Sequence, residues 1–265
     1  MKYIFILFIS VAGSTIYAQT AKEYYKMGIK NNKNGNYYGA IENFNKAIAL
    51  NPSYDSAYYS RGFSKFFWNG WDDSLKNTAA IEDYTKAIAL NPAYAEAYFS
   101  RGLSKFYSRD YKGAIEDFMK TIALNPNHAE AHYRKGLSED TLKDYKSAIE
   151  DYTKVIEAPD YIPNYVSEAY TGRGNCKYKL GDHKGAAEDY YSVGVRRESH
   201  TGGYFYAIEE YDKAIKSDPT YDLAYYNRAN AKLNLGDKAG ACLDWKKASE
   251  LGNKDAAEAI SENCK

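Results

Sequence analysis

The chain has 265 residues, of which 35 are basic and 35 acidic, so its formal net charge is zero. This balance argues against a nucleic-acid or other polyanionic partner, which would require a basic face. Tyrosine is frequent, at 29 residues, and many of the tyrosines recur at fixed intervals along the chain.

The first element is an apolar stretch from Tyr3 to Ile16 that follows Lys2. It is shorter than the roughly 20 residues of a membrane-spanning helix, and the small residue Ala18 follows it. We therefore expect residues 1–18 to be a secretory signal peptide and the protein to be exported, either to the periplasm or out of the cell. Ile16 fits the usual cleavage pattern poorly, so an uncleaved membrane anchor is the alternative. After signal cleavage, we expect no membrane span.

A fifteen-residue segment occurs in three similar copies, AIENFNKAIALNPSY, AIEDYTKAIALNPAY and AIEDFMKTIALNPNH. These copies start at Ala40, Ala80 and Ala114, and weaker echoes start at Ala148 and Ala207. A fixed period in this range indicates a solenoid of stacked units. The landmark residues recur at 34 residues or at 34 plus an insertion: Gly28, Gly62, Gly102, Gly136 and Gly174, and Pro52, Pro92 and Pro126.

One unit, residues 95–128, contains two amphipathic stretches, AEAYFSRGLSKFY and YKGAIEDFMKTIAL. The polar sequence SRD separates them, and Asn125-Pro126 closes the unit because a helix cannot continue through proline. Each unit is therefore predicted to be a hairpin of a first helix, A, and a second helix, B. Glycine inside a helix costs about 1 kcal/mol relative to alanine, so its recurrence in helix A implies that A and B approach too closely for a larger side chain.

The pattern resembles the tetratricopeptide repeat (TPR), in which a large residue, a glycine, an alanine, an aromatic residue and a closing proline hold set places. In the unit 95–128 these places are Tyr98, Gly102, Ala114, Phe118 and Pro126. The resemblance implies an all-α fold, a right-handed superhelical solenoid over residues 19–251 with a C-terminal capping helix at 252–265. Six repeats are implied, at residues 21–54, 55–94, 95–128, 129–166, 167–221 with an extra helix, and 222–251.

A basic residue precedes the repeated glycine in most units, and an aspartate occupies a fixed place in helix B. The unit that has Met27 in place of the basic residue also has Asn43 in place of the aspartate. This covariation favours an ion pair between helices A and B over a basic strip that recognises a ligand. The basic residues are Arg61, Arg101, Lys135, Arg173 and Arg228, and the aspartates are Asp83, Asp117, Asp151, Asp189 and Asp244.

Helices A line the concave face in the family that this chain resembles. Matching inward places in later units are polar, at Glu130, Asp140, Asn175 and Asn230. An apolar row at these places is either a groove for a partner's peptide or ordinary core packing between helices. In the second and third units the row consists of Tyr59, Phe63, Phe66 and Phe67, followed by Phe99, Leu103, Phe106 and Tyr107.

Six extra residues separate helices A and B of the second unit, in a segment that carries Trp68 and Trp71. Insertions in solenoids map to loops on one edge and often make contacts. The alternative is that the tryptophans form an aromatic plug over the end of the hairpin.

The fifth unit contains two stretches that both read as helix B, HKGAAEDYYSVGV and FYAIEEYDKAIKSD. We expect residues 204–216 to lead into the sixth unit, because DPTY after them copies the ordinary junction. Residues 187–203 are then expected to form a local insertion.

Three cysteines are present, and export would place them in an oxidising compartment. Cys242 and Cys264 are equally far from the turn at Asn253, so two antiparallel helices would bring them side by side. We expect a disulfide between them rather than two buried free thiols, with Cys176 left single.

No phosphate loop, nucleophile motif or metal-binding pattern is evident, so we expect a protein that is not an enzyme and needs no cofactor or metal. The predicted function is a protein-interaction scaffold whose aromatic row in repeats two and three binds a peptide or helix of a partner protein. The alternative is a structural or self-assembling scaffold of the cell envelope that uses its edges and ends. The oligomeric state is left open.

Overall fold

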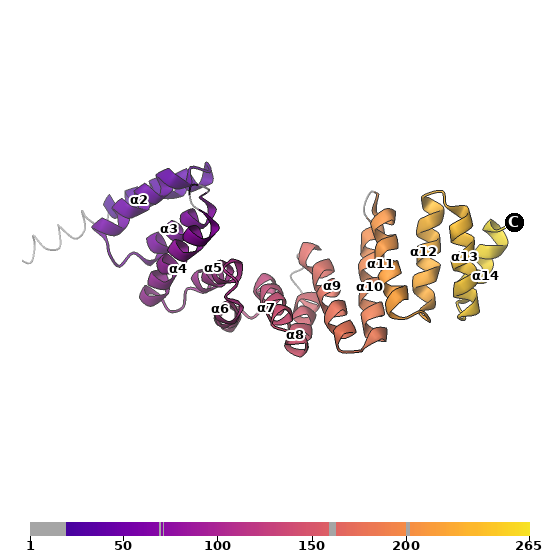
Figure 1. Cartoon of the computed structure of the whole chain (residues 1–265). Helices are drawn as coiled ribbons and strands as arrows, with labels where there is room; N and C mark the ends of the chain where they lie inside the picture. Colours follow the sequence, from indigo (N-terminus) through magenta and orange to yellow (C-terminus); the bar gives the residue numbers. More distant parts are fainter. Residues whose placement is uncertain (1–19, 69, 71, 159–162, 200–201) are drawn as a thin grey trace, which may run out of the picture. The chain divides into compact units, whose positions relative to one another are not determined.

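The computed structural model describes residues 20–265 except 69, 71, 159–162 and 200–201. The predicted signal peptide and Trp71 lie outside the described residues. Every regular element among the residues described is a helix (Figure 1), so the all-α prediction is confirmed. None of these helices is both long and apolar enough to cross a membrane.

Contacts divide the chain into two compact units, Met1–Ala131 and His132–Lys265. The first unit contains a helix over residues 20–33 and then five more helices. They are α2 (Tyr37–Leu50), α3 (Asp55–Phe67), α4 (Asp73–Leu90), α5 (Ala95–Tyr107) and α6 (Tyr111–Leu124).

The second unit holds the remaining helices, except that the first three residues of α7 fall in the first unit. Within it, consecutive helices pack against each other as hairpins. They are α7 (Ala129–Thr141), α8 (Tyr145–Glu157), α9 (Pro163–Lys179), α10 (His183–Glu198), α11 (Gly203–Ser217), α12 (Asp222–Asn234), α13 (Lys238–Glu250) and α14 (Lys254–Asn263).

A repeated turn joins helix A to helix B in most hairpins. A residue with positive φ ends helix A, and the next residue is an Asn or Asp whose side chain caps helix B. In the third hairpin, Arg109 has φ 64° and Asp110 Oδ1 accepts a hydrogen bond from Gly113 N at 3.0 Å. Such a side-chain cap satisfies one of the free N–H groups at a helix start. The same pair of roles belongs to Gly35 and Asn36, Lys143 and Asp144, Gly181 and Asp182, and Gly236 and Asp237.

The recurring glycine lies against the aromatic residue of helix B, and helices A and B approach closely there, as the sequence predicts. A Cβ atom at Gly102 would lie 2.8 Å from Cε1 of Phe118, and one at Gly28 would lie 2.5 Å from Cε1 of Phe44. Both rings are fully buried. Because no real Cβ contact is that short, glycine at this place sets the distance between the two helices of a hairpin.

The predicted ion pairs between helices A and B are confirmed, and four of the five include a second basic residue of helix A. Asp117 Oδ1 lies 2.6 Å from Nη2 of Arg101, and its Oδ2 lies 2.9 Å from Nζ of Lys105. We call this set an ion triad; it satisfies a nearly buried carboxylate with two cations. The same triad joins Arg61, Lys65 and Asp83; Arg173, Lys177 and Asp189; and Arg228, Lys232 and Asp244.

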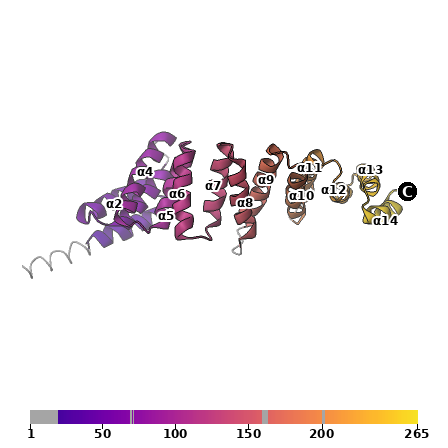
Figure 2. The same ribbon diagram turned by 90° about the horizontal axis from the view of Figure 1, so that it is seen from below.

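Helix α10 belongs to two hairpins at once. It is the B helix of α9, since a Cβ at Gly174 would lie 3.0 Å from Cε1 of Tyr190. It is also the A helix of α11, since a Cβ at Gly194 would lie 2.4 Å from Cε1 of Tyr211. Figure 2 shows α10 beside both α9 and α11. The expectation of a local insertion over residues 187–203 is therefore wrong, because α10 continues to Glu198 and presents a second packing face.

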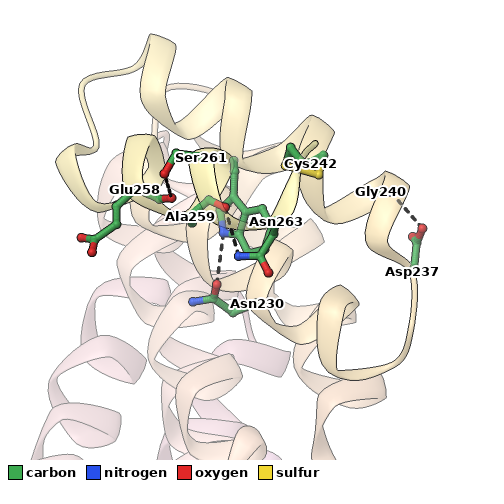
Figure 3. The surroundings of a disulfide bond; sticks show 10 residues. Asn230, Asp237, Gly240, Cys242, Glu258, Ala259, Ser261 and Asn263 are labelled. Carbon is green, nitrogen blue, oxygen red and sulfur yellow. Dashed lines mark hydrogen bonds between the residues drawn. A yellow bond between two sulfur atoms is a disulfide. The ribbon is translucent and has the colours of Figure 1, made fainter.

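The terminal helix α14 covers the apolar end of α13. Ala256 and Ile260 pack with Trp245 in one core cluster, and a disulfide joins Cys242 to Cys264 with the two Cα atoms 5.7 Å apart (Figure 3). This is the pair that the spacing predicted. Cys176 is a buried free thiol, and burial raises its pKa to about 12, so it is unreactive at neutral pH.

Candidate protein-binding groove

A hollow of about 200 Å³ lies between α3 and α5 of the first unit. We call it the aromatic groove. Its lining comes mainly from one face of each helix, because residues at i, i+4, i+7 and i+8 of a helix share a face. The lining residues are Tyr59, Phe63, Phe66 and Phe67 of α3, Tyr84 of α4, and Phe99, Ser100 and Leu103 of α5.

The floor of the groove is part of the core. Tyr84 is 1% exposed, and the rings of Tyr59 and Tyr84 lie 5.7 Å apart between centroids. The ring of Tyr59 also packs on Tyr94, with 4.9 Å between centroids. Burial raises the pKa of Tyr59 and of Tyr84, so both are neutral phenols at physiological pH. The floor is therefore fixed by packing that does not depend on a ligand.

The rim of the groove is exposed. Phe67 is 44% exposed and Tyr107 is 53% exposed. Phe66 lies between them, with its ring centroid 5.1 Å from that of Phe67 and 5.8 Å from that of Tyr107. The row continues to α2, where the ring of Tyr37 stacks on Phe67 with 5.9 Å between centroids. A continuous line of partly exposed rings thus crosses three helices.

The described lining of the groove contains no charged side chain. The nearest cations in the repeat pattern, Arg61 and Lys65, are held by Asp83 in the ion triad. Ser100 supplies a polar group among the aromatic residues. The groove therefore offers apolar burial with little polar recognition.

Most of the predicted groove residues lie together, but not all. Phe106 packs edge-on against Tyr107 and Tyr111, and neither Phe106 nor Tyr107 lines the hollow itself, although Tyr107 borders it through Phe66. The ring of Trp68 lies 5.6 Å from that of Tyr38 on α2. The insertion therefore contacts the preceding repeat through Trp68.

Two lining residues were missed from the sequence. Tyr84 belongs to helix B, and its place as the repeated aromatic residue marks it as core. Ser100 lies one place beyond Phe99 on α5 and carries no distinguishing signal. Both residues line the hollow because it lies between α3 and α5 with Tyr84 of α4 at its floor.

In the second unit the matching inward places are used for internal hydrogen bonds. Asp140 Oδ1 lies 2.7 Å from Nζ of Lys179, and Asn175 Oδ1 accepts a hydrogen bond from the Tyr190 hydroxyl at 2.7 Å. Asn230 Oδ1 accepts one from Nε1 of Trp245 at 3.1 Å (Figure 3). These side chains hold neighbouring helices together, so the aromatic row has no counterpart at these three places.

Within the part of the chain that the structure describes, no group of three or more His, Cys, Asp or Glu side chains could hold a metal ion.

Models of the TPR repeat match residues 32–66 and 76–108, and models of the tetratricopeptide repeat match residues 100–162 and 210–242. Together they span more than half of the chain. The chain belongs to the tetratricopeptide-repeat family. TPR proteins are generally non-catalytic scaffolds that bind other proteins, and this chain is a TPR interaction scaffold.

Several solved structures resemble this chain in fold. A crystal structure of MamA is 26% identical, with a TM-score of 0.58, and the match covers 65% of this TPR protein and 95% of MamA. A TPR protein from Parabacteroides merdae is 20% identical, with a TM-score of 0.56, and the match covers 93% of this chain and 100% of the other. MamA from Desulfovibrio magneticus RS-1 is 20% identical, with a TM-score of 0.59 over 68% of this chain and 97% of that one. No curated protein matches significantly.

Proposed function

We propose that the aromatic groove binds a helix or an extended segment of a partner protein through apolar side chains. The observation that carries the proposal is the rim, where Phe67 and Tyr107 are about half exposed above a buried floor. A soluble chain seldom leaves a contiguous apolar patch uncovered unless something binds there.

The chemistry of the groove favours an apolar partner surface. Fully burying a large apolar side chain stabilises a complex by roughly 1.5–3 kcal/mol. Phe67 and Tyr107 are already half covered, so each has on the order of 1 kcal/mol to contribute. The parallel rows on α3 and α5 suit a helix that presents apolar residues at i, i+3 or i+4, and i+7.

The rival function is a structural or self-assembling scaffold of the cell envelope that uses its edges and ends. It predicts that crosslinks from the groove capture no specific partner protein and that substitutions on the rim have no effect on assembly. Crosslinking from the groove therefore distinguishes the two functions.

The test is site-specific photocrosslinking from position 67 in the native cell, followed by mass spectrometry of the product. We expect one partner protein, and we expect the double substitution of Phe67→Glu and Tyr107→Glu to abolish its binding to the purified chain. Both side chains are exposed, so helicity should be unchanged. A matched control is Met119→Glu, because Met119 is 54% exposed on the B helix α6. Equal loss of binding in the control, or binding that survives the double substitution, would contradict the proposal.

We further propose that the protein is exported, with residues 1–18 removed as a signal peptide. The disulfide between Cys242 and Cys264 supports this proposal, because disulfides persist mainly in oxidising compartments. The intact mass of the protein purified from cells should correspond to a chain that begins at Gln19. A mass that retains residues 1–18 would favour the uncleaved anchor.

A further inference from the structure

In the fourth repeat, the three places of the ion triad hold residues with a different balance of positive and negative charges. In the third repeat, Arg101 and Lys105 of helix A hold Asp117 of helix B. In the fourth, the same three places hold Lys135, Glu139 and Asp151. The ordinary triad matches two cations to one carboxylate, whereas this set matches one ammonium group to two carboxylates.

The four polar groups of the fourth repeat form one connected cluster. Lys135 Nζ lies 2.5 Å from Oε1 of Glu139 and also donates to Oδ2 of Asp151. His132 Nδ1 lies 2.7 Å from Oδ1 of Asp151. His132 occupies the place of Tyr98, the ring over which Arg101 stacks in the third repeat. We call these residues the α7–α8 cluster.

Glu139 is buried and incompletely satisfied. The residue is 5% exposed, and its Oε2 atom has no hydrogen-bond partner. A buried ionised carboxylate with a bare oxygen is costly, whereas the protonated acid is not. Burial raises the pKa of Glu139 to about 7, the hydrogen bond from Lys135 acts to lower it, and the charge of Asp151 raises it further.

The other titratable groups around Glu139 do not supply the missing cation. On α7 itself they are Lys135, His132 and Asp140, and the last is held by Lys179 of α9 at 2.7 Å. On α8 they are Asp151 and Tyr152, whose buried hydroxyl also has no partner. Burial acts to raise the pKa of Asp151, but bonds from His132 and Lys135 outweigh it, and the pKa lies below its usual range. Asp151 is therefore the member that stays ionised. Burial raises the pKa of Cys176 on α9, so that thiol remains neutral.

We propose that the α7–α8 hairpin is a pH-sensitive element, tightly packed when Glu139 holds a proton and loosened when Glu139 ionises. The direction of this pH dependence follows from the linkage between proton binding and folding. The pKa of Glu139 is about 7 in the folded chain and near its ordinary value when unfolded. The stabilisation that protonated Glu139 gives the hairpin is therefore complete at a pH below the ordinary pKa of glutamate. It is lost as the pH rises to about 7. We expect no such dependence in the ordinary triads, because they have a lysine in place of the second buried carboxylate.

The experiment is hydrogen exchange of the full chain between pH 5.5 and pH 8, corrected for the intrinsic pH dependence of amide exchange. We expect the opening constant of α7 and α8 to rise roughly tenfold or more over this range, while that of the α5–α6 hairpin stays constant. In Glu139→Gln the rise should disappear, because the amide cannot ionise. In Glu139→Lys it should also disappear, because the two-cation set of the other repeats is restored.

Two further variants test whether Glu139, and not a neighbouring group, causes the pH dependence. Histidine commonly changes charge in the same pH range, so His132→Tyr, which installs the ordinary residue of the repeat, should retain most of the dependence. Lys105→Glu should transplant a similar dependence into the α5–α6 hairpin. The proposal is overturned if Glu139→Gln keeps the wild-type dependence or if His132→Tyr removes it.

Discussion

The recurring aspartate of helix B is a side chain that the repeat both buries and neutralises. Asp117 has only 3% of its side chain exposed and is bound by Arg101 through two nearly parallel hydrogen bonds of 2.6 and 2.9 Å. Such a bidentate pair gives specific geometry as well as energy. It sets the rotation of helix B relative to helix A, and one missing partner would leave a buried charge.

We expect Arg101→Met to destabilise the chain by about 1–3 kcal/mol, because Asp117 would then keep only Lys105. Asp117→Asn should destabilise it by a similar amount, and the double variant by less than the sum. The free energy of unfolding in urea measures all three. Strict additivity would show that the pair contributes no mutual stabilisation. Lys120→Met is a suitable control because Lys120 lies on an exposed part of α6.

Among the elements, α10 departs most from the repeat. An ordinary helix of this fold presents either A-type or B-type residues, but α10 presents both. Its B face carries Asp189 and Tyr190, and its A face carries Gly194 and Arg197. In the α10–α11 hairpin, Glu210 takes the part of the aspartate, with Arg197 at 3.2 Å. The stack therefore continues through the fifth repeat with one added helix.

A substitution at Gly194 tests this double role. Alanine is normally favoured over glycine inside a helix by about 1 kcal/mol, but a Cβ at Gly194 would lie 2.4 Å from the buried ring of Tyr211. We therefore expect Gly194→Ala to lower the midpoint of thermal unfolding. The control Val195→Ala, at the neighbouring position that is 42% exposed, should have little effect. A stabilising Gly194→Ala would show that α11 does not pack against this face of α10.

Within each unit of the whole molecule, a helix packs mainly against the helices next to it in sequence. Stability is then approximately a sum of hairpin terms and interfaces between neighbours. Damage to one hairpin should remain local. The terminal helix α14 and its disulfide give the last hairpin a neighbour that covers its apolar side.

Trp245→Ala tests this locality, because Trp245 is 1% exposed at the centre of the last core cluster. Removing a buried aromatic side chain costs about 3–5 kcal/mol. Hydrogen exchange should show lost protection in α12, α13 and α14, with α2 to α5 unchanged. Leu243→Ala on the same helix, at a residue 68% exposed, should preserve protection throughout. Equal loss of protection in both units would mean that the chain unfolds as one cooperative body.

Features with a local cause could be predicted from the sequence. The period of 34 residues predicted the hairpins, and the recurring glycine predicted the close approach of helices A and B, which the structure shows at Gly102 and Phe118. One unit has Met27 in place of the basic residue and Asn43 in place of the aspartate, and this paired change predicted the ion pairs in the other units. The equal distance of Cys242 and Cys264 from a turn predicted which cysteines are bonded. In each case the geometry of a single hairpin was enough, because a helix places every third or fourth residue on one face.

Three features required the tertiary structure. From the sequence, Phe106 and Leu103 were equal candidates as groove residues, but only Leu103 lines the hollow. It could not show that α10 uses two faces, since that depends on α11 folding back over Gly194. It also contained Glu139 without showing that one of its oxygens lacks a partner. The period determines which residues share a face of a helix, whereas the helices that pack around that face determine whether it is covered, shared or open.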